Sequence, residues 1–150
     1  MTEPFMLHQV DELVTRSHSD GITDLTAAAL IGQHGRFLLV QVGSLEPNMT
    51  RAWSLPTGPV LPGETVVDGL RRILAKGFGY SDAEITGFLG TIDTDDSATR
   101  TFVFAISTGQ PDGICRDGQI PHRWIDNITI SDLVPVINPV LRTYYATDHD

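Results

Sequence analysis

Residues 58–80, GPVLPGETVVDGLRRILAKGFGY, join a proline-rich loop to a short helix. The loop begins at residue 52, and its prolines fall at every third position: Pro56, Pro59 and Pro62. Because proline fixes φ and lacks a backbone donor, residues 52–65 are predicted to form an extended loop, neither a helix nor an inner strand.

The helix that follows has clear start and stop signals. Thr65 and Asp68 have the spacing of a capping box, which predicts that the helix begins at about Val66. Gly77 and Gly79 are predicted to end it. The apolar positions at helical spacing are Val66, Val67, Leu70, Ile73 and Leu74.

The rest of the chain alternates between helical and strand patterns. Apolar residues at spacings of three and four predict an amphipathic helix over residues 5–20. Two apolar strands surround GQHG in a hairpin, and three further strands and a last helix follow the box helix. Those later segments are residues 84–94, 99–108, 122–128 and 139–146. The pattern predicts an N-terminal helical extension, residues 1–22, and one mixed α/β domain, residues 23–150.

The loop and helix resemble the Nudix hydrolase superfamily, whose box reads G-x5-E-x7-R-E-U-x-E-E-x-G-U, with U a bulky apolar residue. Gly58, Glu64, Arg72 and Gly79 match this box without a gap. The flanking strands look similar too, so the resemblance covers about residues 24–146. It implies an α/β/α sandwich with a mixed sheet between helices, and metal-dependent hydrolysis of diphosphate compounds.

Three box glutamates of the family are replaced in this chain. Ile73, Lys76 and Gly77 stand at their positions, and Thr57 replaces the first glycine of the usual LPGG. The family's carboxylates converge on Mg²⁺ or Mn²⁺, whereas an aliphatic group, an ammonium and a bare glycine offer no hard oxygen ligand. The sequence therefore predicts a degenerate Nudix protein with no metal site and no cofactor.

Two interpretations of the surviving polar box residues stay open. Glu64 is either a residual ligand or catalytic base, or a cap that pairs with Arg72 and braces the loop. Arg71, Arg72 and Lys76 form either a metal-free cradle for a phosphate or carboxylate, with Lys76 supplying the charge of the ion, or a solvated helix face.

Candidate residues outside the helix are fewer. His122 is a candidate acid or base, because the loop before it borders the ligand side in the family. Trp53 is a candidate for the ligand-binding pocket wall or for the core. Asp93, Asp95 and Asp96 are either replacement metal ligands or ordinary turn residues.

Composition restricts the partners. A net charge of −9 makes nucleic acid and anionic membranes unfavourable partners, and a single cysteine fits a reducing, cytoplasmic setting. No apolar run is long enough to span a membrane. A homodimer is compatible with the resemblance, because related proteins often form one.

Three functions fit these observations. The leading prediction is a protein that has lost diphosphate hydrolysis and keeps a pocket for a nucleotide or a phosphate or carboxylate metabolite. Such a protein is either a binding module or a metal-independent enzyme that uses Glu64, Lys76 or His122. The alternative is a residual hydrolase of nucleoside diphosphate derivatives that recruits other acids.

Overall fold

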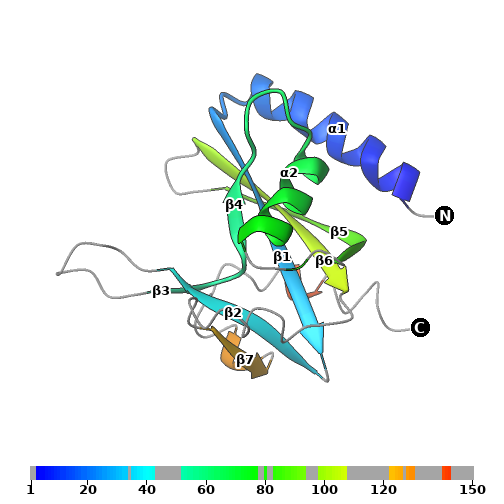
Figure 1. The fold of residues 1–150 in the computed structure, drawn as a ribbon. Coiled ribbons are helices and arrows are strands. Elements are labelled where there is room, and N and C mark those ends of the chain that lie inside the picture. Colours follow the sequence, from blue (N-terminus) through cyan, green and yellow to red (C-terminus); the bar gives the residue numbers. More distant parts are fainter. Residues whose placement is uncertain are drawn as a thin grey trace.

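The elements follow one another as helix, strands, box helix and strands (Figure 1). A computed structural model describes residues 3–33, 35–42, 52–77, 80, 83–93, 98–107, 122–126, 128–130 and 140–142. The labelled helices are α1 (Glu3–Ser19), α2 (Val66–Arg72) and the π-helical turn η1 (Ile73–Gly77). Residues 128–130 are helical as well, and so are residues 140–142, the described part of the last helix predicted over 139–146. The strands are β1 (Asp24–Gln33), β2 (Arg36–Val42), β3 (Ala52–Ser54), β4 (Thr57–Pro59), β5 (Glu84–Asp93), β6 (Thr99–Ser107) and β7 (His122–Asp126).

The strands form one mixed sheet, as predicted. Its main order is β3-β2-β1-β6-β5, with β4 added to β1 and β7 added to β2. β1 and β6 run parallel, from the pair Asp24 and Thr99 to the pair Ile31 and Ile106, and the other pairings are antiparallel.

Apolar side chains cover both faces of the sheet. Ala27, Ala29 and Ile31 of β1 belong to the core on the side of α1 and α2. The alternate residues Ala28 and Leu30 belong to a second core. That second core includes three residues of the C-terminal part of the chain, Ile130, Val140 and Leu141. A strand buried on both faces has a continuous apolar sequence, which is the pattern of residues 27–31. The predicted sandwich is confirmed.

The proline-rich segment differs from its prediction as a loop, because it contributes two short strands. β3 pairs with residues 40–42 of β2, and β4 pairs with residues 26–28 of β1. Among the described residues β4 pairs with β1 alone, and such an edge position tolerates Pro59. The prediction that this segment is extended and not an inner strand is correct.

The N-terminal helix shares the core of the domain. Val10 of α1 is buried with the residues of α2, and buried Ser17 donates a hydrogen bond to the carbonyl of Leu13 at 2.7 Å. Arg100 of β6 donates to Ser17 Oγ at 3.2 Å and to Asp20 Oδ2 at 3.1 Å. Helix α1 and the adjoining Asp20 are thus bound to the sheet by packing and by polar contacts.

Arg100 also binds Asp93, one of the candidate replacement ligands. Its Nε and Nη2 donate to the two oxygens of that carboxylate at 2.7 and 2.9 Å. The pairing lowers the pKa of Asp93 and raises the pKa of Arg100. Asp93 thus joins the two strands of a hairpin. Asp95 and Asp96 lie outside the described residues.

No helix among the described ranges is long and apolar enough to cross a membrane.

Candidate functional site

A bidentate ion pair between Glu64 and Arg72 closes the box loop onto the helix. Arg72 Nε donates to Glu64 Oε2 at 2.9 Å, and Arg72 Nη2 donates to Glu64 Oε1 at 3.0 Å. The same Nη2 donates to the carbonyl of Pro59 at 2.7 Å, and the backbone N–H of Leu61 donates to Glu64 Oε1 at 2.9 Å. The predicted pairing of Glu64 with Arg72 is confirmed, and both carboxylate oxygens have donors.

These contacts set the charge state of the pair. The hydrogen bonds from Arg72, and then from the Leu61 N–H, lower the pKa of Glu64, and Lys76 adds a weaker electrostatic effect in the same direction. The hydrogen bond to Glu64 raises the pKa of Arg72. A base needs a pKa near the working pH to be effective, so this environment suits a permanently ionised clamp better than a proton acceptor.

Local sequence explains how the helix begins beside this clamp. Thr65 Oγ1 accepts a hydrogen bond from the backbone N–H of Asp68 at 3.1 Å, which confirms that half of the capping box. Gly69 lies directly against Glu64. A Cβ added at residue 69 would be 3.0 Å from Glu64 Oε1, so a larger residue there would crowd the clamp. This close approach was not predictable from the sequence, where Gly69 is an ordinary glycine inside a helix.

Ile73 occupies the first of the replaced glutamate positions and belongs to the core. Its side chain is 6% exposed, and its neighbours in the cluster include Leu70 and Leu74. A Cβ placed on Gly58 would lie 2.8 Å from Ile73 Cγ1, so β4 and the helix approach each other closely there. Ile73 therefore packs the helix against β4.

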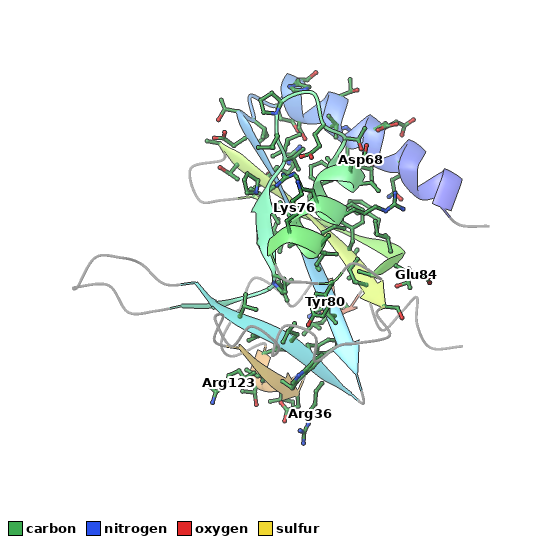
Figure 2. All side chains as sticks on the ribbon, in the orientation of Figure 1. Arg36, Asp68, Lys76, Tyr80, Glu84 and Arg123 are labelled. Atoms are coloured by element: carbon green, nitrogen blue, oxygen red, sulfur yellow. The ribbon has the colours of Figure 1, made fainter. Side chains whose placement is uncertain are left out.

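The three cations of the predicted cradle do not lie on one side of the helix. Arg72 is bound to Glu64, and exposed Lys76 lies near enough to Glu64 to influence it. Figure 2 shows Lys76 at the end of the box helix, where η1 contacts β4. Arg71 instead lines a cavity between α1 and α2. A cradle on the Glu64 side thus includes Arg72 and Lys76, with Arg71 on another side of the helix.

The backbones of the two remaining candidates lie on either side of β2. Trp53 of β3 pairs with Gln41, and His122 begins β7 opposite Val40. Val40 also pairs with Ser54, so β3 and β7 flank the same residue of β2. The side chains of Trp53 and His122 lie outside the described part of the structure, so their roles stay predictions.

The donor set of the box does not fit a divalent metal ion. Position 73 is a buried aliphatic side chain, position 76 is an ammonium, and position 77 has no side chain. Glu64, the one box glutamate that remains, already accepts three hydrogen bonds. Mg²⁺ requires several oxygen ligands in near-octahedral geometry, which this set does not supply. Within the described residues, no three His, Cys, Asp or Glu side chains are grouped for metal binding.

The Glu64 clamp predicts an acid-sensitive contribution to stability. Because the folded-state pKa of Glu64 lies below its ordinary value of 4.5, the contribution is present above about that pH and is lost as the pH falls through the folded value. Glu64→Gln removes this contribution, so we expect its melting temperature to fall less steeply than that of the wild type between neutral pH and about pH 3.

Thermal melts at closely spaced pH values measure this difference. Some acid dependence remains in the variant, because the pKa values of Asp93 and Asp126 are lowered as well. Parallel melting curves for the two proteins would show that the Glu64 clamp contributes no pH dependence.

Comparisons with known proteins agree with the geometry. The model of the NUDIX domain matches residues 23–134. No curated protein sequence matches the chain.

Three solved structures share the fold. A NUDIX hydrolase from Nitrosomonas europaea is 20% identical, with 83% of this chain and 90% of that chain covered and a TM-score of 0.63. An Ap4A hydrolase from C. elegans is 18% identical over 84% and 98% of the two chains, with a TM-score of 0.62. A UDP-X diphosphatase is 16% identical over 93% and 71%, with a TM-score of 0.64.

Proposed function

Because this chain belongs to the NUDIX domain family, we propose that it is a Nudix-fold binding protein for a small anionic metabolite, without metal-dependent diphosphate hydrolysis at its box. The ligand is a nucleotide or another phosphate or carboxylate compound. The observation that carries the proposal is the placement of the box residues. Ile73 is buried in the core, and the carboxylate of Glu64 is bound by Arg72.

Charge supports an anionic ligand at this site. Glu64, Arg72 and Lys76 together bear one carboxylate and two cations, so the cluster is positive within a chain of net charge −9. Interactions between exposed charges are screened beyond about 8–10 Å, so the local cations outweigh the distant acids for a ligand in contact with them. Lys76 stands at the position of a metal-binding glutamate of the family's box, so it supplies positive charge in place of a ligand to the ion.

Two other functions have weaker support. A residual hydrolase needs replacement acids, and Asp93 is already bound by Arg100. A metal-independent enzyme needs a proton acceptor, and the lowered pKa of Glu64 makes that carboxylate a poor one. Binding without turnover requires neither group.

Isothermal titration calorimetry with Mg²⁺, Mn²⁺ and ADP tests the proposal. We expect no saturable metal binding, no release of phosphate from ADP, and ADP binding that does not require metal. Lys76→Glu should weaken ADP binding at least about fivefold, because it replaces an attraction with a repulsion.

The control is Arg36→Glu, which makes the same change of charge at an exposed residue far from Lys76 (Figure 2). We expect it to leave ADP binding unchanged. Metal binding accompanied by hydrolysis of ADP would contradict the proposal, and so would equal losses of affinity in the two variants.

A further inference from the structure

The carboxylate of Glu64 is held in the way that a bound anion would be. Arg72 and the backbone N–H of Leu61 donate three hydrogen bonds to its two oxygens, at 2.9–3.0 Å. The side chain is 18% exposed, and buried Gly69 leaves the space that Oε1 fills. The box loop and the helix thus form a carboxylate-binding arrangement, and a side chain of the same chain occupies it.

The bidentate edge of Arg72 is taken up by this contact. A guanidinium has five N–H donors, and its parallel donors match a carboxylate or a phosphate. In Arg72, Nε bonds to Glu64, and Nη2 bonds to both Glu64 and the carbonyl of Pro59. Nη1 is the one nitrogen that bonds to no group in the part of the chain that the structure describes. An external anion therefore meets Arg72 with its bidentate edge already occupied.

Lys76 is in a different state. Its side chain is exposed, and its ammonium bonds to no group within the described ranges of the chain. It lies close enough to Glu64 to act on that carboxylate electrostatically. Of the two cations in the proposed anion site, Lys76 is therefore ready for a ligand, whereas Arg72 must first leave Glu64.

We propose that Glu64 is an internal competitor of the anionic ligand, which occupies Arg72 and lowers the affinity of the site. This inference rests on the proposed function. A ligand that binds to both cations through their charged donors must displace the Glu64 carboxylate from Arg72. When the binding-competent arrangement is a minor one, the apparent affinity falls in proportion to its population. Loosening the pair between Glu64 and Arg72 should therefore raise the affinity for an anion.

Calorimetric titration with ADP, without metal, tests this inference with two substitutions at one position. Glu64→Gln removes the charge of the competitor. Glu64→Asp keeps the charge and shortens the side chain, so the carboxylate is drawn back from Arg72. We expect ADP to bind at least about fivefold more tightly to Glu64→Gln, and at least about twofold more tightly to Glu64→Asp, than to the wild type. A gain in Glu64→Asp does not come from a change in net charge.

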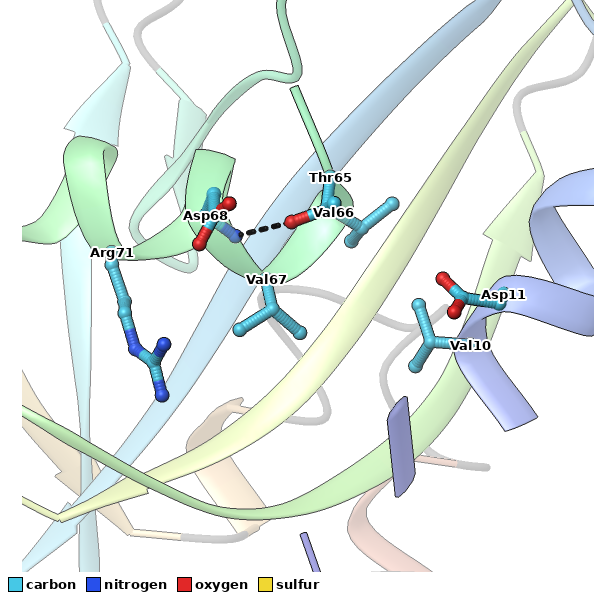
Figure 3. Close-up of a pocket in the computed structure, with 7 residues that line it drawn as sticks. All are labelled: Val10, Asp11, Thr65, Val66, Val67, Asp68 and Arg71. Atoms are coloured by element: carbon cyan, nitrogen blue, oxygen red, sulfur yellow. Dashed lines mark hydrogen bonds between the residues drawn. The ribbon is translucent and has the colours of Figure 1, made fainter. Parts of the chain in front are cut away.

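Asp68→Asn is the matched control for charge. Asp68 is exposed on the same helix and borders a separate cavity between α1 and α2 (Figure 3). The substitution removes one negative charge, leaves the pair of Glu64 and Arg72 intact, and keeps the backbone N–H that bonds to Thr65. We expect it to change the ADP affinity less than about twofold, because exposed charges are screened by water and salt.

Arg72→Gln assigns the gain to one contact. A competitor has nothing to release once the guanidinium is absent, so Glu64→Gln should give less than about a twofold gain in the Arg72→Gln background. Circular dichroism of each variant without ADP establishes that it is folded before the affinities are compared.

Equal gains in Glu64→Gln and Asp68→Asn would overturn the inference, because a change of charge would then be sufficient. So would a full gain in the Arg72→Gln background, or a Glu64→Asp variant that binds ADP no more tightly than the wild type does. In each of these cases, ADP binding by the wild type still supports the proposed function. Absence of ADP binding in the wild type and in every variant would overturn both.

Discussion

Replacing Leu70 with alanine should lower the free energy of unfolding by about 2–5 kcal/mol. Leu70 lies in the middle of α2, is fully buried, and belongs to the core cluster that also contains Leu38 and Phe104. Removing its isobutyl group loses apolar burial and leaves a cavity that the packed sheet cannot fill. Whole domains are stable by only about 5–15 kcal/mol, so this single change removes a large share.

Leu61→Ala is the matched control. Leu61 lies in the box loop and is 46% exposed, so the same substitution there should change stability by less than about 0.5 kcal/mol. Urea unfolding measures both variants, and a lower midpoint at an unchanged slope reports a true loss of stability. Similar losses in the two variants would show that α2 is not held by Leu70.

The same packing orients the polar residues of the helix. Leu70 faces the sheet, Arg72 reaches Glu64, and Arg71 borders the α1 cavity. The buried face of the helix, with Leu70 at its middle, thus determines where the two neighbouring arginines project. The proposed anion site depends on this orientation.

The sequence predicted the features that depend on local chemistry. The capping spacing of Thr65 and Asp68 correctly placed the start of α2. Of the two interpretations open for Glu64, the structure shows the pairing with Arg72. The continuous apolar residues 27–31 correctly predicted a strand, because every side chain in a doubly buried strand faces a core.

Features that depend on distant partners were not predictable. The strand at Thr57–Pro59 exists because β1 offers it an edge, and the loop pattern alone does not reveal that partner. Asp93 was open as a turn residue or a replacement metal ligand, and its local sequence showed no sign of the ion pair with Arg100. The sequence did not predict that Arg71 borders a cavity beside α1, because that placement depends on where α1 lies. In each case the missing information is a contact between segments that the local sequence does not encode.

Replacing Gly58 with alanine should destabilise the protein by about 1–3 kcal/mol, because the new methyl group would overlap a side chain that cannot move away. Its Cβ would lie 2.8, 2.9 and 3.2 Å from Cγ1, Cδ1 and Cγ2 of Ile73. Ile73 is buried, and a β-branched side chain in a helix has one strongly preferred χ1 rotamer. The strand and the helix must therefore separate to admit the methyl group.

Gly87→Ala is the control within the same sheet. A Cβ at Gly87 meets no atom within 4 Å and its backbone has no positive φ, so we expect a change of less than about 0.5 kcal/mol. Thermal or urea unfolding of the two alanine variants measures the difference. A Gly58→Ala protein as stable as Gly87→Ala would contradict the close approach.

The double variant Gly58→Ala, Ile73→Ala assigns the cost to this one contact. Ile73→Ala removes all three overlapping atoms, so Gly58→Ala should cost much less in that background than in the wild type. The coupling free energy from the four proteins should be about 0.5–3 kcal/mol, within the range for residues in direct contact. Additive effects would mean that Ile73 does not fix the spacing of β4 from the helix. A clear coupling would mean that position 73, a glutamate in the family's box, serves in this chain to pack the box together.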